Sequence, residues 1–364
     1  MLKIDESSIE ALAIGGLILG GGGGGGMAGG IANAKQSLTD NKSPNIIKVE
    51  DLPAQATVLT ISAVGAPSST DQYVETEDFV KIVELFEKNY DVKVDAVITN
   101  EMGGGSSFNA FLPSALKGIP MVDASCNGRA HPLGTMGAMG LAEMPNYVTQ
   151  QTAVGGNPAK NQTVQLVTQG SVQATSTLVR QAAVEAGGLV VVARNPVSKE
   201  FILENAALGT LTQSYEVGEA FLKGTTPREK VENVAEYLEG SLVCEGVVED
   251  FELRMTGGLD EGKFTINDQG DAYTLFIWNE YMAMDKNGER QNTFPDLLMS
   301  FDQETGLPVT TAELKAGQAI FVLQVPYQKL ALGGGMYEAS GYKKIEETLN
   351  IDILTYVQEI IKEK

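Results

Sequence analysis

Seven consecutive glycines, Gly20–Gly26, restrict what this chain can fold into more than any other stretch. Each glycine in a helix interior costs about 1 kcal/mol relative to alanine, and a strand gains no side-chain packing from it. An ordered chain keeps such a run where the backbone needs a positive φ or approaches other atoms too closely for a Cβ. Apolar residues flank the run on both sides, so we predict that its backbone peptide groups, without side chains, form one wall of a binding site. A flexible surface linker is the alternative, because glycine-rich composition also describes linkers.

The charge of the chain limits its partners. The formal net charge is −21 over 364 residues. Phosphate binding needs clustered Lys and Arg, so this excess of acidic residues argues against nucleic acid and against anionic membrane surfaces. We expect a cytoplasmic protein that binds a small-molecule substrate and forms a homo-oligomer. The length is typical of one large or two medium domains.

Cysteine, histidine and the N-terminal flank exclude further classes. Cys126 and Cys244 are too few for a disulfide framework, and a single histidine, His131, excludes the common zinc sites. A divalent metal held by carboxylate oxygens stays open as a cofactor. Residues 11–34 are mostly small or apolar, as in a signal peptide or a membrane-spanning helix. Acidic residues precede it where a signal peptide carries positive charge, so we predict neither.

Hydrophobic periodicity predicts an α/β domain over residues 1–240. Strand, helix, strand, helix, strand is the order of a mostly parallel sheet with helices on its faces. The predicted strands are 57–64, 93–99, 119–122 and 189–193, and the predicted helices are 4–19, 27–37, 76–88, 107–116, 171–186, 215–222 and 227–238. Segment 133–161 shows no strong period, and we expect a long, partly ordered segment there.

We expect a second domain to begin near Gly240, where the sequence pattern changes from helix-like to strand-like. Short alternating runs separated by turn signals predict a small antiparallel β-barrel or sandwich over residues 241–330. The tail, 331–364, is predicted to end in an amphipathic helix over 351–361. That helix docks on the first domain or forms a dimer contact.

Loops after the predicted strands are expected to meet at one edge of the sheet. The first strand leads into Gly65-Ala66-Pro67, the second into Asn100–Gly105, and the third into Asp123–Pro132. Ligands of such sheets bind beyond the carboxyl ends of the strands. Together with the glycine run these loops predict a ligand-binding set of Gly22, Gly23, Gly24, Gly25, Gly65, Gly103, Gly104 and Asn127. No Gly-Lys-Ser/Thr follows the glycines, so a phosphate-binding P-loop is excluded by pattern.

Five residues in these loops could carry chemistry. Glu101 and Asp123 follow predicted strands and could each act as general base or metal ligand, or simply cap a helix. Cys126 is the one candidate nucleophile, with Arg129 to acidify it and His131 as its base. A small buried thiol, a structural ion pair and an ordinary loop histidine are the alternative interpretations of these three residues.

Several motifs, in this order, resemble one bacterial family. They are IEALAIGGLILGGGGGGGM at 9–27, GAP at 65–67, EMGGG at 101–105, MVDASCNGRAHP at 121–132, WNEYMA at 278–283 and FPDLLMSFDQETGLPVTTAELKAGQAIFVL at 294–323. Together they resemble the S-methyl thiohydantoin desulfurase family, long catalogued as a domain of unknown function and linked to hydantoinase/oxoprolinase proteins. The resemblance implies an α/β domain plus a β-barrel domain and action on five-membered cyclic amide or thioamide rings.

Two functions follow from the residues and the resemblance. The first is a hydrolase on a hydantoin-, thiohydantoin- or oxoproline-like ring, with backbone N–H groups of the glycine loop as oxyanion donors. The second is a non-catalytic binding or accessory subunit of a hydantoinase-like system. It stays open because the family has acidic residues where this chain has Ser125 and Leu133.

Overall fold

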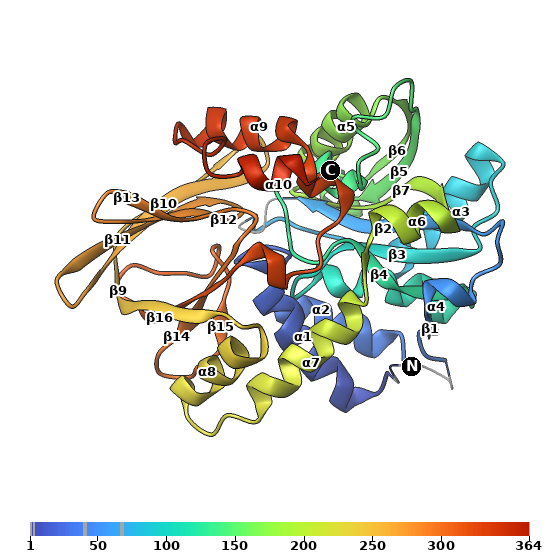
Figure 1. The fold of residues 1–364 in the computed structure, drawn as a ribbon. Helices are drawn as coiled ribbons and strands as arrows, with labels where there is room; N and C mark the ends of the chain where they lie inside the picture. The colour runs from blue at the N-terminus through green and yellow to red at the C-terminus, as the bar shows by residue number, and fades with distance from the viewer. Residues whose placement is uncertain (1, 3, 39–41, 66–68, 364) are drawn as a thin grey trace.

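The computed structural model describes residues 2, 4–38, 42–65 and 69–363, and in this part of the chain the strands form two sheets (Figure 1). The first sheet has the order β1-β4-β3-β2-β7-β5-β6, with β8 paired to β4. Strands β1, β4, β3 and β2 are parallel to one another, whereas β7, β5, β6 and β8 pair antiparallel. The strands are β1 (Ile46–Ile47), β2 (Thr57–Gly65), β3 (Ala96–Glu101), β4 (Met121–Asn127), β5 (Thr149–Gly155), β6 (Val164–Gly170), β7 (Leu189–Ser198) and β8 (Ala207–Leu208). The predicted α/β class is confirmed, with a mixed sheet.

Helices cover both faces of this sheet. Helices α1 to α4 share one large apolar core with the first face, while α5 covers β5 and β7 on the second face and α6 packs beside it. Helices α7 and α8 complete the first core on its outer side. The bounds are α1 (Glu6–Gly20), α2 (Met27–Gln36), α3 (Thr76–Tyr90), α4 (Phe111–Lys117), α5 (Val172–Glu185), α6 (Lys199–Asn205), α7 (Thr210–Leu222) and α8 (Pro227–Tyr237).

Helix α1 is buried along nearly its whole length because it lies between the two sheets. Leu12 and Ile18 share an apolar cluster with Leu323 of the second sheet. A helix that is apolar on all sides is typical of such a buried position. Gly15 allows α7 to approach closely, since a Cβ there would overlap the carbonyl of Ser214. Gly21 then ends α1 in the left-handed conformation, at φ +61°, and the glycine run leads away from the core.

The second sheet is antiparallel throughout. Its order is β13-β12-β11-β10-β9-β16-β14-β15, and in the described strands β13 and β15 do not pair, so the sheet is open and sandwich-like instead of closed as a barrel. The strands are β9 (Ser241–Thr256), β10 (Leu259–Asp268), β11 (Asp271–Trp278), β12 (Glu280–Lys286), β13 (Glu289–Thr293), β14 (Leu297–Asp302), β15 (Pro308–Val309) and β16 (Ala319–Val325). The predicted antiparallel unit is confirmed.

Two predictions about secondary structure are wrong. Segment 133–161 contains strand β5, which pairs with β7 and β6 in the first sheet. The predicted helix over 351–361 is absent from that range except for α10 (Gln358–Lys362), and α9 (Ala339–Leu349) precedes it. Asn350 takes φ +54°, and the Glu346 carboxylate accepts from the N–H groups of Ile353 and Leu354. Both features turn the chain at the end of α9 and hold the next residues in a loop.

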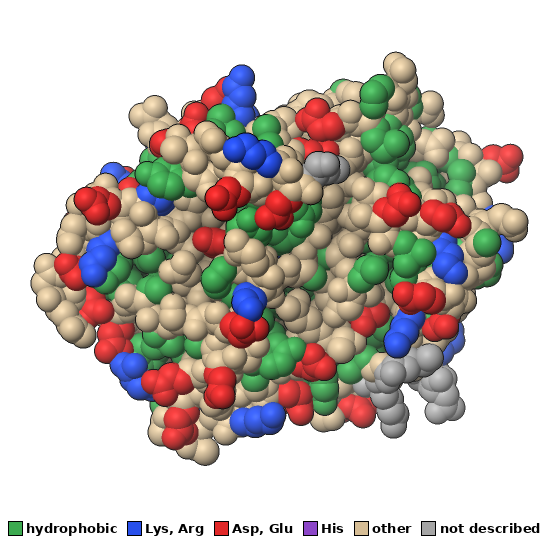
Figure 2. All heavy atoms as spheres, viewed as in Figure 1, with side chains coloured by type: hydrophobic (Ala, Val, Ile, Leu, Met, Phe, Trp, Pro, Cys, Tyr) green, Lys and Arg blue, Asp and Glu red, His purple; other side chains and the backbone are tan. Residues whose placement is uncertain are grey.

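The surface carries its negative charge in dispersed form. On the face drawn in Figure 2, acidic side chains are spread over several elements and alternate with Lys and Arg. Within the ranges that the structure describes, no helix combines the length and the apolar character needed to cross a membrane.

Candidate active site

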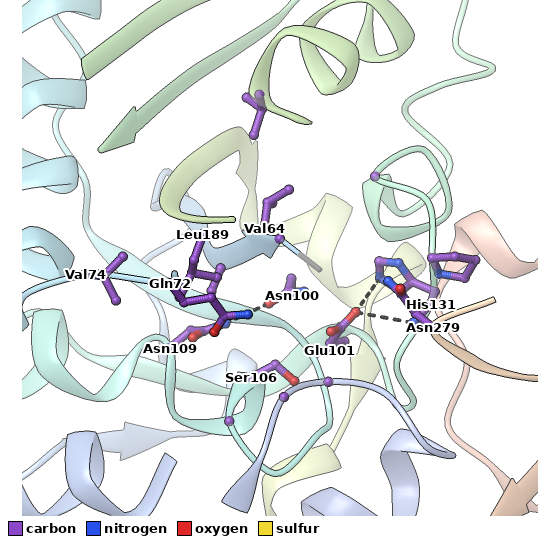
Figure 3. A pocket seen from close by; sticks show the side chains of 18 of the residues that line it. Val64, Gln72, Val74, Asn100, Glu101, Ser106, Asn109, His131, Leu189 and Asn279 are labelled. Carbon is purple, nitrogen blue, oxygen red and sulfur yellow. Dashed lines mark hydrogen bonds and ion pairs between the residues drawn. The ribbon is translucent and has the colours of Figure 1, made fainter. Parts of the chain in front are cut away.

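A cavity of about 250 Å³ lies at the carboxyl ends of β2 and β3, where the glycine run meets both sheets (Figure 3). Gly24 and Gly25 line it together with Gly65, Glu101 and His131. The structure therefore brings these predicted residues together in one space. Gly22, Gly23, Gly103, Gly104, Asp123, Cys126, Asn127 and Arg129 do not line it, and Ala66 and Pro67 of the predicted loop lie outside the described residues.

The glycine run is ordered because two backbones pack directly on each other. The Gly24 carbonyl accepts hydrogen bonds from the N–H groups of Gly105 (3.0 Å) and Ser106 (2.9 Å). Gly24 has φ +76°, and a Cβ on it would lie 2.6 Å from the Cα of Gly103. A Cβ on Gly104 would lie 2.8 Å from the Gly25 carbonyl oxygen. Glycine is required here for close backbone approach, which a flexible linker does not need.

Gly22 and Gly23, the two glycines that precede Gly24, fix the run against β12 and the segment between β15 and β16. The Gly22 carbonyl accepts from the Thr311 N–H at 3.0 Å, and a Cβ on Gly23 would overlap the carboxylate of Glu280. On the other side of the run, Gly26 precedes α2 without a side-chain cap. The N–H groups at the start of α2 therefore have no side-chain partner from that position. A helix N-terminus of this kind favours a negatively charged or carbonyl oxygen.

Glu101 and His131 form a buried pair at the cavity wall. Nε2 of His131 lies 3.3 Å from Oε2 of Glu101, and the backbone N–H of His131 donates to the same oxygen at 3.4 Å. Burial raises the pKa of Glu101 to about 7, although the nearby charge of Arg194 opposes the shift. Burial lowers the pKa of His131 to about 3. At neutral pH the histidine is therefore neutral, and the carboxyl group of Glu101 is divided between its two protonation states.

Glu280 is a second buried carboxyl group in the same cavity, and it was not among the predicted site residues. It lies at the corner between β11 and β12, with its side chain only 2% exposed. Burial, reinforced by the charge of Glu101, raises the pKa of Glu280 well above its ordinary value. Its position within the WNEYMA motif is the signal that could have identified it. Two carboxyl groups in one buried cavity are a common arrangement of an acid and a base.

Two arginines, one in the first sheet and one in a helix that covers it, are the positively charged residues that line the cavity in the described part of the chain. Arg194 of β7 is 3% exposed, and its Nε has no hydrogen-bond partner among the described residues. Arg180 of α5 donates to the carbonyls of Gly65 (3.2 Å), Gly258 (3.0 Å) and Pro132 (3.2 Å). Arg180 thus joins three segments of the cavity wall to the turn at Gly258, whereas Arg194 is the arginine with capacity left for a bound carbonyl or oxyanion.

Asp123 caps a helix and does not face the cavity. Its carboxylate accepts from the N–H groups of Leu211 (2.9 Å) and Thr212 (3.3 Å) at the start of α7. The prediction placed Asp123 after a strand, but β4 continues to Asn127, so Asp123 lies within the strand. Asn127 likewise has a structural contact, since its Oδ1 accepts from the Gly333 N–H at 3.2 Å.

Replacing Asp123 by alanine should therefore reduce stability and leave chemistry intact. We expect Asp123→Ala to lower the free energy of unfolding by about 1–2 kcal/mol through loss of the cap. Asp123→Asn, which keeps an acceptor oxygen, should lose less. Urea denaturation and turnover per folded molecule measure the two effects separately. A fully stable Asp123→Ala protein without turnover would contradict this assignment.

Cys126 lies in an apolar cluster behind the sheet, with its side chain fully buried. Its Sγ is 3.2 Å from Oγ1 of Thr60, and burial raises the pKa of the Cys126 thiol to about 11. The thiolate form that a nucleophile needs is thus disfavoured, contrary to the predicted acidification.

Arg129 is also buried away from the cavity. Its Nη1 donates to the Pro295 (2.9 Å) and Asp296 carbonyls, and its guanidinium lies 4.4 Å from the centre of the Phe294 ring.

Native Cys126 should accordingly resist thiol reagents. We expect an aromatic disulfide reagent to label no cysteine in the folded protein and both cysteines after denaturation, because Cys244 is buried too. Cys126→Ala should retain turnover within about a factor of two. Fast labelling of one thiol in the native state, with parallel loss of turnover, is the outcome that restores the nucleophile.

The side chains that could coordinate a metal ion are not grouped into a metal site in the described residues. In the described ranges there is no group of three or more His, Cys, Asp and Glu side chains arranged to hold a metal ion. The two predicted ligands, Glu101 and Asp123, do not line the same cavity. The chemistry considered below therefore uses only side chains and backbone groups of the chain.

This chain is similar to known family models and to a solved structure over almost its full length. The model of the S-Me-THD-like N-terminal domain matches residues 7–159, and that of the S-Me-THD-like C-terminal domain matches residues 170–333. An X-ray structure of a protein from Chromobacterium violaceum has a TM-score of 0.70 and 18% sequence identity, covering 96% of this chain and 97% of that chain. At this identity the likeness concerns the fold alone. No curated protein sequence matches the chain.

Proposed function

This chain belongs to the S-Me-THD-like family, and from that premise we propose that it hydrolyses a five-membered cyclic amide or thioamide in the cavity beside the glycine run. The S-methylated thiohydantoin ring that the family name abbreviates is the substrate we favour. The observation that carries the proposal is the position of Glu101. Its carboxyl group, with a pKa of about 7, lines the same small cavity as Glu280, His131 and Arg194.

In this proposal Glu101 is the general base. Its ionised form takes a proton from a water molecule, whose oxygen forms a bond to the ring carbon that carries the S-methyl or carbonyl group. His131 is neutral at this pH, and its backbone N–H donates to the Glu101 carboxylate at 3.4 Å. Negative charge that develops on the ring nitrogen or oxygen faces Arg194 and the start of α2.

Glu280 supplies the proton that the leaving group needs. Burial raises the pKa of Glu280 well above its ordinary value, which favours its protonated form. As the C–S bond of an S-methyl ring breaks, the sulfur takes this proton and leaves as methanethiol. For a plain cyclic amide, the C–N bond breaks and the nitrogen takes it. One water is consumed in either case, and the proton held by Glu101 restores Glu280 or passes to solvent.

An amide pair in the cavity wall matches such a ring. Nδ2 of Asn109 donates to Oδ1 of Asn100 at 3.1 Å, and both side chains line the cavity beside Ser106. The Oγ of Ser106 is buried and has no hydrogen-bond partner among the described residues. Amide and hydroxyl groups offer both donors and acceptors, as a cyclic –CO–NH– group requires.

Incubation with S-methyl thiohydantoin, hydantoin and 5-oxoproline tests the proposal. Methanethiol is detected with a thiol reagent, and ring opening by mass spectrometry. We expect turnover of at least one ring, with the S-methyl compound fastest. The competing function is ligand binding without chemistry, which gains weight from Leu133, a cavity-lining residue where the family has an acid. A compound that raises the melting temperature but is recovered unchanged supports that function instead.

A further inference from the structure

We infer that the cavity selects rings carrying a short, uncharged aliphatic substituent, an inference that rests on the proposed function and specifies its substrate. Its basis is a group of four apolar side chains, here called the apolar end, which line the cavity together. They are Val64 of β2, Val74 before α3, Phe79 of α3 and Leu189 of β7. Three segments thus contribute apolar side chains to this part of the cavity, whose remaining lining mixes polar residues with apolar ones such as Leu133 and Val179.

The apolar end lies opposite the proposed reacting groups. In Figure 3, Val64 lies above Asn100 near the middle of the cavity, Val74 and Leu189 lie to one side of it beside Gln72, and His131 and Asn279 lie on the other side. Asn100, Glu101 and Ser106 lie between them. A ring whose reacting carbon is at Glu101 and whose amide meets Asn100 therefore extends its remaining substituent toward the apolar end.

The charges of the cavity favour a neutral substituent at this end. Glu101, when ionised, opposes a second anion in the same small space. Arg180 also lines the cavity, but three of its N–H groups already bind carbonyls, among them that of Gly65. A carboxylate at the apolar end would lose its water shell against Val64, Val74 and Leu189, which is unfavourable without a full partner.

The size of the cavity limits the substituent. A volume of about 250 Å³ is below the roughly 300–1,000 Å³ of sites for drug-sized ligands. The ring occupies part of this space, so we expect a branched group of three or four carbons to fit better than a large aromatic group. Each methylene buried in an apolar site strengthens binding by about fourfold. Because Val64, Val74 and Leu189 are partly exposed, we expect a three-carbon group to gain at least about tenfold.

Calorimetric binding of three rings tests this inference without turnover. The ligands are hydantoin, 5-isopropylhydantoin and 5-carboxymethylhydantoin, and the protein is the full chain carrying Glu101→Gln. We expect the isopropyl compound to bind at least about tenfold tighter than hydantoin and the carboxymethyl compound to bind most weakly. Adding Val74→Asp, in an irregular segment, should remove the preference for isopropyl. Adding Val148→Asp, an equally apolar but 51% exposed position that does not line the cavity, should leave it.

The outcomes separate the two levels of the proposal. Equal affinities for the three rings, or tightest binding of the carboxymethyl compound, overturn the inference and leave the proposed function standing. A preference for isopropyl that survives Val74→Asp also overturns it, because the apolar end would not be its source. Failure of all three rings to bind, in this protein and in a wild-type thermal-shift assay, removes the proposed function together with the inference.

Discussion

Glu101→Gln should reduce kcat by about 10² to 10⁴-fold, the usual contribution of a general base. The amide has nearly the shape of the carboxyl group, but it cannot accept a proton from water at neutral pH. In the wild type, kcat/KM should fall about tenfold per pH unit below pH 7, because burial raises the pKa of Glu101 to about 7. Steady-state rates between pH 5 and 9 measure both effects. Wild-type activity that stays constant from pH 5 to 7 would argue against Glu101 as the base.

The same substitution should increase stability, which separates lost chemistry from lost folding. The pKa of Glu101 is raised from 4.5 to about 7 in the folded state, so the folded state binds more protons than the unfolded state between these values. Wild-type stability therefore falls as pH rises from 4.5 to 7, and the full cost of about 3 kcal/mol is present above pH 7. Glu101→Gln removes this cost. Urea denaturation at pH 8 should show a more stable variant, whereas a destabilised one would mean that the charged form has favourable contacts.

Gly24→Ala should destabilise the protein by about 2–5 kcal/mol. Alanine at φ +76° costs about 1–2 kcal/mol by itself. In addition, its Cβ would lie 2.6 Å from the Cα of Gly103, which is backbone and cannot rotate away. Overpacking of this kind costs about 1–3 kcal/mol further. Thermal and urea denaturation give the loss directly.

Gly29→Ala is the matched control for this prediction. Gly29 lies within α2, and a Cβ on it would meet no atom within 4 Å. The substitution should leave stability unchanged or raise it by up to about 1 kcal/mol, because alanine favours the helix. Should Gly24→Ala prove as stable as Gly29→Ala, the close packing of the Gly24 and Gly103 backbones would not be a requirement of the fold.

The sequence predicts local structure well where one short segment is sufficient. The β-branched run at 57–64 and the apolar run before Glu101 form β2 and β3 as predicted. Glu101 then follows from its place at the end of β3. The prediction for Asp123 fails for a local reason: polar Ser125 and Asn127 were taken as loop residues. Both are fully buried and extend β4, so the strand ends four residues after Asp123.

Long-range pairing explains what the sequence could not predict. Arg194 reaches the cavity because β7 pairs antiparallel with β2 in the centre of the first sheet, and no local pattern indicates that partner. Glu280 reaches it because the second sheet packs against α1 and the glycine run. The Tyr281 N–H donates to the Gly21 carbonyl at 3.0 Å, which holds this corner in place. Such contacts depend on how distant segments dock, and residue spacing does not encode them.

A crystal structure of the Glu101→Gln protein with an S-methyl thiohydantoin tests the central proposal most directly. We predict electron density for the ring in the cavity between Gly24–Gly26 and Asn100, with the carbon that carries sulfur separated from the residue 101 side chain by one water molecule. A ring bound elsewhere on the protein, or one held with that carbon turned away from both residue 101 and Glu280, would contradict it.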